Sequence, residues 1–84
     1  MTLTPVDAEI LFRLNERPGK GMTSPRLAYF AIASRTTVDR RLAFMKEQGL
    51  VEDDGKYRGR LYYKTERGTK AREAWGRAHR GADL

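Results

Sequence analysis

The residues with the clearest chemical potential follow a serine in the middle of the chain. Ser34 is followed at once by Arg35, Thr36 and Thr37, and then by Arg40. An arginine guanidinium can donate two parallel hydrogen bonds to guanine O6 and N7, and a threonine can hydrogen-bond a base or contact the thymine methyl group. Side chains of these types on the first turns of a helix predict a surface that reads the edges of DNA bases.

These side chains lie on the helix with the best-defined ends, residues 34–48, for which Ser34 is the predicted N-cap. Val38, Leu42 and Met45 recur at the spacing of one helical face, and Gly49 stands where a left-handed residue commonly ends a helix. At about 100° per residue, the side chains that point away from this apolar face are Thr36, Asp39, Arg40, Ala43 and Glu47. The first turns are therefore expected to be exposed and polar, with Arg35 and Thr37 on the flanks.

A second basic segment falls in a predicted β-hairpin with strands at 50–52 and 61–64. The loop between the strands, residues 53–60, contains two glycines and four side chains suited to phosphate: Lys56, Tyr57, Arg58 and Arg60. Cationic side chains on a protruding hairpin can contact phosphates or enter a narrow minor groove. Tyr57 can donate to a phosphate or pack under the hairpin. The hairpin is predicted to contribute affinity more than sequence choice.

Three further helices complete the predicted order of elements. Threonine or serine followed by proline starts the first helix, which ends at about Asn15, and the short second helix, which ends at about residue 31. Thr65 is the predicted cap of the last helix. In the first turn of the second helix, Ser24 and Arg26 are expected to contact a DNA backbone.

The order helix, helix, helix, hairpin, helix predicts a mostly α fold with a small β-hairpin. This is a winged helix-turn-helix with a three-helix core, a two- or three-stranded wing and a C-terminal helix. A chain of 84 residues is too short for two hydrophobic cores. We therefore expect a single domain over residues 1–80 and a frayed tail at 81–84.

Charge and composition favour a polyanionic partner and disfavour catalysis. Lys and Arg number 17 against 11 Asp and Glu, a net charge of +6, and residues 56–80 alone carry nine basic and two acidic side chains. With no cysteine and one histidine, neither a metal site nor a cofactor is expected, and the chain is predicted not to be an enzyme. The adjacent Asp53 and Asp54 precede a glycine and are predicted to form a turn.

Membrane and secreted classes also find no support in the sequence. No apolar run approaches the roughly 20 residues that cross a bilayer. The first residues lack the basic start and apolar stretch of a signal peptide. We therefore expect a cytoplasmic, nucleoid-associated protein whose partner is double-stranded DNA, with no membrane partner and no small-molecule ligand.

Three parts of this pattern resemble the helix-turn-helix and wing of MarR-type and PadR-type transcription regulators. They are Leu27-Ala28, the gapless block from Ser34 to Val51, and the stretch from Gly59 to Gly68. The resemblance extends from residue 23 to about residue 75. It implies a sequence-specific transcription regulator, acting as a repressor, with helix 34–48 in the major groove and the wing, residues 53–62, on phosphate or in the minor groove.

The chain departs from the family pattern in two places. Ile32 and Ala33 stand where the turn often has glycine and then valine, which predicts a longer or tighter turn. The families also carry further helices for dimerisation or ligand sensing, whereas the last helix here offers a thin apolar stripe of Ala71, Ala74, Trp75 and Ala78. This stripe is compatible with a homodimer that is weak or forms only on DNA, and equally with a monomer.

Two other functions fit the same features. An architectural, replication or recombination protein would bind random and cognate duplexes alike, and a protein-interaction module would use the basic surface against an acidic partner. Two side chains also have alternative roles. Asp39 either accepts a hydrogen bond from cytosine N4 or caps against Thr36, and Arg41 either contacts phosphate or pairs with an acidic neighbour.

Overall fold

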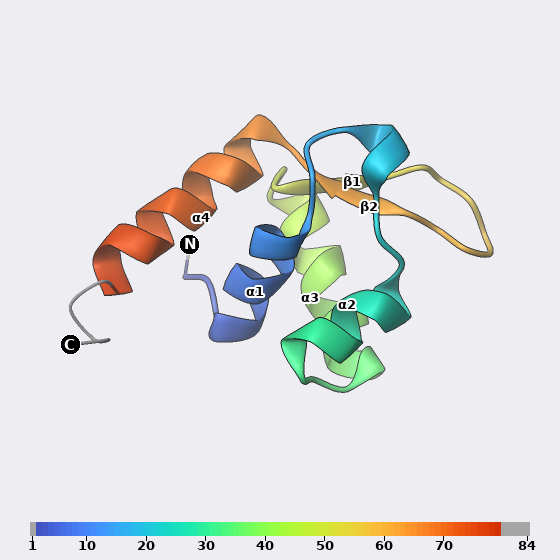
Figure 1. Ribbon diagram of the computed structural model, residues 1–84, viewed down its shortest axis with the longest axis horizontal. Coiled ribbons are helices and arrows are strands. Elements are labelled where there is room, and N and C mark those ends of the chain that lie inside the picture. The colour runs from blue at the N-terminus through green and yellow to red at the C-terminus, as the bar shows by residue number, and fades with distance from the viewer. Residues whose placement is uncertain (1, 80–84) are drawn as a thin grey trace.

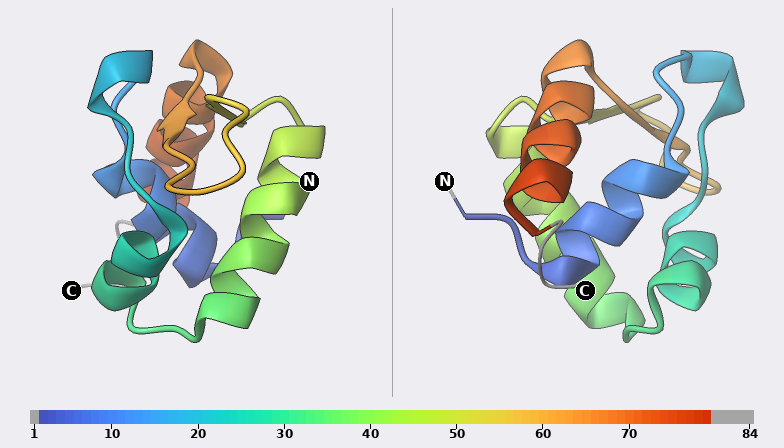
Figure 2. Two further views of the ribbon diagram at one scale, coloured as in Figure 1. Left: turned by 90° about the vertical axis from the view of Figure 1, so that its right-hand side faces the viewer. Right: turned by 60° about the vertical axis from the view of Figure 1, so that its left-hand side comes forward.

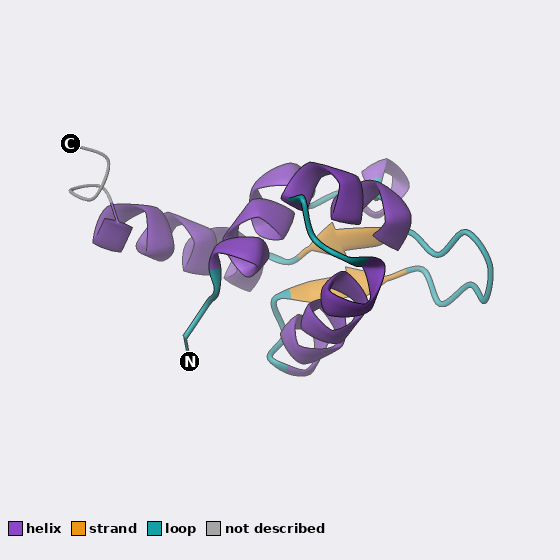
Figure 3. Ribbon diagram, turned by 90° about the horizontal axis from the view of Figure 1, so that it is seen from below, coloured by secondary structure: helices purple, strands orange, loops and turns teal. Residues whose placement is uncertain are grey.

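The computed structural model describes residues 2–79 and places a hairpin wing beside three packed helices (Figure 1). In chain order the elements are α1 (Pro5–Arg13), the 3₁₀ turn η1 (Pro18–Lys20), α2 (Ser24–Ala31), α3 (Arg35–Glu47), β1 (Val51–Asp53), β2 (Tyr62–Lys64) and α4 (Glu66–His79). Helix α4 and the hairpin loop project toward opposite ends of the molecule (Figure 3). This architecture confirms the predicted winged helix-turn-helix. The predicted frayed tail, residues 81–84, lies outside the described residues.

Helices α1, α2 and α3 bury their apolar faces against one another and against the start of the wing. The buried cluster consists of Ile10, Leu11, Leu14, Leu27, Val38, Leu42, Met45, Leu50 and Val51. Its three members on α3 are the face predicted from the sequence. The exposed residues on α3 include the predicted outer face of Thr36, Asp39, Arg40, Ala43 and Glu47. The predicted orientation of this helix is therefore confirmed.

The end of α3 sets the direction in which the chain enters the wing. Gly49 has a φ of +78°, and the N–H groups of Gly49 and Leu50 donate to the carbonyls of Lys46 and Met45 at 3.0 and 2.8 Å. This is a Schellman ending, which glycine adopts without a Cβ clash. The predicted glycine stop is confirmed. Because Leu50 belongs to this ending, β1 begins one residue later than predicted, at Val51.

Strands β1 and β2 form an antiparallel hairpin in which Val51 lies opposite Lys64 and Asp53 lies opposite Tyr62. A single residue before α2 extends this sheet. Met22 and Tyr62 exchange two backbone hydrogen bonds of 2.9 and 2.8 Å. The wing therefore has two strands and a third that is one residue long, and this third pairing ties the start of α2 to the base of the hairpin.

Helix α1 is shorter than predicted, ending at Arg13 instead of Asn15. The backbone of Leu14 is extended, with φ −78° and ψ 146°, and its side chain is buried in the core. We attribute the early ending to this burial, since the chain leaves the helical path where Leu14 enters the core.

A buried ion pair joins the first turn of α1 to α3. Asp7 is fully buried, and its carboxylate oxygens accept hydrogen bonds from Nε and Nη2 of Arg41 at 2.8 and 2.7 Å. The same carboxylate accepts from the backbone N–H of Thr4, which completes a capping box at the start of α1. The hydrogen bonds to Asp7 raise the pKa of the Arg41 guanidinium. Of the two predicted roles of Arg41, pairing with an acidic neighbour is the one observed.

The turn between α2 and α3 contains a residue in an unfavourable backbone conformation. Ile32 adopts a left-handed conformation, with φ 51° and ψ 49°, and its side chain is 94% exposed. The turn occupies the three residues between Ala31 and Arg35, a usual length for a helix-turn-helix. The prediction of a longer or tighter turn is therefore wrong, because the backbone of Ile32 adopts the conformation that glycine normally supplies.

Replacing Ile32 by glycine is expected to stabilise the fold by about 1 kcal/mol, because glycine removes the left-handed strain and no buried contact is lost. For a domain of this size the melting temperature should rise by about 4–8 °C. Thermal unfolding by circular dichroism measures the change. Ile32→Ala is the matched control, since alanine keeps the Cβ and should gain much less. Equal melting temperatures for the two variants would contradict the strain at this position.

Candidate nucleic-acid interface

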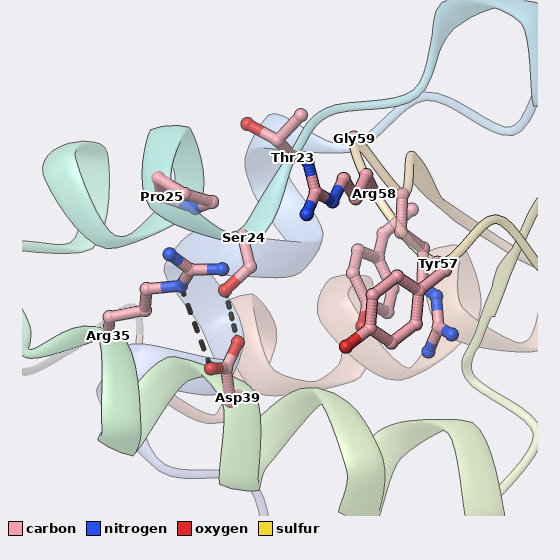
Figure 4. Close-up of a pocket in the computed structure, with 10 residues that line it drawn as sticks. Thr23, Ser24, Pro25, Arg35, Asp39, Tyr57, Arg58 and Gly59 are labelled. Atoms are coloured by element: carbon pink, nitrogen blue, oxygen red, sulfur yellow. Dashed lines mark hydrogen bonds and ion pairs between the residues drawn. The ribbon is translucent and has the colours of Figure 1, made fainter.

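The start of α2, the first turns of α3 and the wing surround one open groove (Figure 4). Its charged lining residues are Arg35 from α3, Arg58 and Arg60 from the wing, and one carboxylate, Asp39. The remaining lining residues are Thr23, Ser24, Pro25, Tyr57, Gly59 and Tyr62. The structure thus brings the predicted base-reading segment, the start of the second helix and the wing to one surface, where positive charge predominates.

Asp39 joins two of these elements. Its carboxylate accepts a hydrogen bond from the Ser24 hydroxyl of α2 and lies 3.8 Å from Nε of Arg35, one helical turn earlier (Figure 4). Ser34, as predicted, caps the start of α3. The predicted cap between Asp39 and Thr36 is therefore wrong, because the carboxylate is directed toward α2. Asp39 positions α2 and Arg35 at the groove.

Two of the predicted DNA-contacting hydroxyl groups already have partners in the protein. Ser24 is only 7% exposed and its hydroxyl donates to Asp39. The hydroxyl is thus engaged within the protein, where it helps to position Asp39. The contact of Ser24 with phosphate stays a prediction. The Thr37 hydroxyl accepts a hydrogen bond of 2.9 Å from Ser34 as part of the α3 cap, although the Thr37 residue itself stays exposed.

Thr36 and Arg40 occupy the outer face of α3. Both residues are exposed, and within residues 2–79 neither side chain forms a hydrogen bond or an ion pair. The Arg35 side chain, by contrast, lies toward Asp39. Arg40 is therefore the arginine of α3 whose guanidinium is most available to a ligand outside the groove.

Two aspartates shape the base of the wing loop. The Asp53 carboxylate accepts a hydrogen bond from the N–H of Gly55 at 2.7 Å, and the Asp54 carboxylate accepts from the N–H of Lys56 at 3.1 Å. The Asp54 carboxylate also lies 3.3 Å from the N–H of Leu61 on the other arm of the loop. The prediction that these carboxylates form a turn is confirmed.

Asp53 also ties the wing to α3. Its side chain is only 3% exposed and lies 2.8 Å from Nζ of Lys46 and 4.0 Å from Nε of Arg60. Arg60 Nε further donates to the Lys56 carbonyl at 2.8 Å. The Nε atom of Arg60 is therefore engaged in holding the loop, and the DNA contact of this residue stays a prediction.

The contacts of Lys46 with Asp53 escaped prediction from the sequence. The only signal for them is a pair of opposite charges on either side of Gly49. Because the Schellman ending turns the chain back, residues seven apart come into contact with no helical or strand periodicity to indicate it. The hydrogen bond from Lys46 lowers the pKa of Asp53, and the same bond raises the pKa of Lys46.

Acidification is expected to weaken the contact between Asp53 and Lys46. Because the pKa of Asp53 is lower in the folded state, its ionised form stabilises the fold above about pH 4, and this stabilisation is lost as the pH falls through the lowered value. The raised pKa of Lys46 acts at the alkaline end, where stability is lost as the pH rises through it. Thermal unfolding between about pH 7 and pH 2 should therefore show a smaller acid loss in Asp53→Asn than in the wild type. The same acid dependence in both proteins would contradict this origin.

The end of the wing carries three exposed side chains. Lys56 and Arg58 are exposed, and Tyr57 between them is 92% exposed. The alternative in which Tyr57 packs under the wing is thereby excluded. Within residues 2–79, neither Lys56 nor Arg58 forms an ion pair. These three residues are the part of the wing most available to a partner.

The predicted dimer contact lies far from this groove, on α4. Ala71 packs partly against the core, whereas Ala78 is exposed. The Trp75 ring is half-buried and stacks on His79 with 4.0 Å between ring centroids, and α4 is held to α1 by a hydrogen bond of 3.0 Å from Arg72. Ala74, which is also exposed, Trp75 and Ala78 are therefore the accessible part of the predicted apolar stripe. In the described part of the chain, no helix is both long and apolar enough to span a membrane.

No family model matches the chain, and no curated protein matches it in sequence. Solved structures do resemble it. A MarR-family transcriptional regulator from Silicibacter pomeroyi superposes with a TM-score of 0.79 and 22% identity, over 96% of this chain and 55% of its own. A mutant of S. aureus MepR superposes with a TM-score of 0.76 and 19% identity, over 96% of this chain and 61% of its own. Lactococcus lactis ZitR, in a structure with DNA, superposes with a TM-score of 0.71 and 22% identity, over 87% of this chain and 50% of its own.

These likenesses show a shared winged-helix fold. They confirm the predicted resemblance to MarR-type regulators at the level of the fold. This chain spans 50–61% of the length of the three structures compared above.

Proposed function

We propose that this chain binds double-stranded DNA sequence-specifically in the nucleoid of the cytoplasm and represses transcription by occupying its operator. The observation that carries the proposal is the basic groove formed jointly by α2, α3 and the wing, beside the exposed outer face of α3. The major groove of DNA accepts one α-helix, whose first turns reach the base edges. The shared fold with ZitR, which was solved in complex with DNA, supports this use of the surface.

Base reading is assigned to four side chains on the first turns of α3. Arg40 and Thr36 lie on its outer face, and Arg35 and Thr37 lie on the flanks, where each already has a contact within the protein. The positive end of the α3 dipole would lie close to the DNA backbone in this arrangement. Arg40 is the strongest candidate for bidentate contact with a guanine, because its guanidinium is both exposed and unpaired among residues 2–79.

The wing and the start of α2 are assigned to the phosphate backbone. Lys56, Tyr57 and Arg58 contact phosphate or the minor groove from the end of the loop, with Arg60 and Asp53 holding the loop in place. Arg26, exposed in the first turn of α2, adds a further cation. These contacts supply affinity for any duplex, and α3 supplies the choice of sequence.

Replacing Arg58 by alanine is expected to weaken binding to all duplexes alike. Losing one phosphate contact should make the slope of log K against log salt concentration shallower by about one unit. Gel-shift titrations over a series of salt concentrations measure this slope. Arg77→Ala removes the same charge from the exposed side of α4 and should leave the slope as in the wild type. Equal slopes for Arg58→Ala and wild type would remove the wing from the interface.

The apolar stripe on α4 bears on the oligomeric state. Ala74, Trp75 and Ala78 include only one large apolar side chain for a stable interface, which typically buries about 800 Å² on each partner. We propose a chain that is monomeric when free and pairs, if at all, on adjacent half-sites of DNA. Analytical ultracentrifugation with and without duplex measures this state, and a stable dimer in the absence of DNA would contradict it.

Selection from a pool of random duplexes tests the proposed function. A sequence-specific regulator should enrich a defined motif within a few rounds. Binding without enrichment would favour an architectural, replication or recombination role. Affinity at low salt weaker than the roughly 10⁻⁴–10⁻⁶ M of non-specific binders would favour a protein-interaction module instead.

A further inference from the structure

A second basic groove lies on the far side of Thr23 from the groove in Figure 4. Its cations come from three elements: Arg13 at the end of α1, Lys20 of η1 and Arg26 of α2. No aspartate or glutamate is among its lining residues. Thr23 lines both grooves and so forms part of the wall between them.

Two of these cations share one aromatic ring. The Arg13 guanidinium carbon lies 4.6 Å from the centre of the Phe30 ring, and that of Arg26 lies 5.8 Å from the same centre. Stacking on a ring restricts a guanidinium while leaving its N–H edges free to donate. Glu9 lies 3.6 Å from Arg13, and Arg26 has no ion pair among residues 2–79. Two like charges on one ring repel each other, and an anion bound between them would relieve this repulsion.

The hairpin separates the two grooves. Leu61 lines the second groove, whereas its neighbours Arg60 and Tyr62 line the first, as expected for side chains that alternate along an extended strand. The backbone pairing of Met22 with Tyr62 holds the α2 approach against this strand. Viewed from the wing end, the hairpin loop lies between α3 on one side and the segment from η1 to α2 on the other (Figure 2).

We infer that this second groove binds a backbone phosphate of the same duplex, on the side of the wing away from α3. The inference rests on the proposed function and extends its footprint by a contact made by α1 and η1. Phosphate is the favoured occupant because two arginines and a lysine line the groove and no carboxylate does. A duplex is the favoured source because the wing between the two grooves is itself assigned to the DNA backbone.

The double variant Arg13→Gln/Lys20→Gln tests this contact. It leaves α3 and the wing unchanged, and it should make the salt slope shallower by up to about two units and weaken binding on the order of 10-fold at physiological salt. Hydroxyl-radical footprinting, which reports on the deoxyriboses of the backbone, should show that protection is lost only outside the base-contacting segment. Lys70→Gln/Arg77→Gln, which removes two charges from the exposed side of α4, is the matched control.

Lys20→Gln alone guards against a folding effect. Within residues 2–79, the only hydrogen bond that Lys20 forms with a side chain uses its backbone carbonyl, which the substitution keeps. A loss of DNA affinity in Lys20→Gln at an unchanged melting temperature supports the contact between the second groove and a phosphate. If the wild type binds a selected motif but the groove variants behave like the α4 control, the second groove is not part of the interface and the proposed function still holds. If the wild type binds no duplex, the proposed function fails. Recovery of groove-dependent binding with RNA or an acidic protein alone would overturn the inference.

Discussion

Replacing Asp7 by alanine is expected to lower the free energy of unfolding by about 3 kcal/mol, the largest loss among the side-chain contacts described above. The carboxylate is fully buried and accepts hydrogen bonds from Arg41 and from the N–H of Thr4. Its removal leaves the Arg41 guanidinium without its partner and opens the cap of α1. Breaking a buried ion pair typically costs about 3–5 kcal/mol. We place the loss at the lower end of this range because the Arg41 side chain is 24% exposed.

Urea unfolding of Asp7→Ala measures this loss. It is a large part of the total stability, because the free energy of unfolding of natural domains is only about 5–15 kcal/mol. Lys70→Ala provides the matched control, since it breaks an exposed pair with Glu66 and should change stability by less than about 0.5 kcal/mol. The double variant Asp7→Ala/Arg41→Ala should lose less than the sum of the two single variants, because no unpaired charge remains. A loss below about 1 kcal/mol in Asp7→Ala would show that the pair behaves like a surface contact.

Replacing Arg40 by alanine is expected to cost about 1–3 kcal/mol on the selected motif, which is roughly a 5- to 150-fold loss of affinity. Arg40 stands on the exposed face of α3, and among the described residues it forms no ion pair that would have to break on binding. Removing a bidentate base contact should also relax the sequence preference at one or two positions. Repeating the selection with the variant measures that relaxation directly.

Arg77→Ala on α4 is the charge-matched control for this variant. It should bind the motif almost as the wild type does, since a cation far from the groove contributes little once salt screens it. If Arg40→Ala loses equal affinity for the motif and for random duplex, Arg40 contacts phosphate only. The assignment of base reading to the outer face of α3 would then be wrong.

Local rules predicted α3 closely. The Ser34 cap, the spacing of Val38 and Leu42, and the glycine stop at Gly49 each depend on residues near one another in sequence, and all three are confirmed. The exposed face that they imply is the face of the proposed base contacts. The turn before α3 was predicted less well, because the sequence pattern does not reveal that Ile32 adopts the conformation expected of glycine.

The contacts that position the site could not be predicted in the same way. Asp39 reaches Ser24 across 15 residues, and Asp7 reaches Arg41 across 34. No periodicity links such positions, since they meet only once the three helices have packed. For the same reason, the sequence does not tell which hydroxyl groups and arginines are free to bind a partner. The structure shows that Ser24 and Arg60 already have contacts within the protein.

The ratio of two affinities tests the central claim that this chain reads DNA sequence. Both are measured by titration in the same buffer at physiological salt, one for the selected duplex and one for a scrambled duplex of equal length and composition. A sequence-specific regulator should bind the selected duplex at least about 10³-fold more tightly. A ratio near one would contradict the claim and leave a DNA-binding surface without sequence recognition.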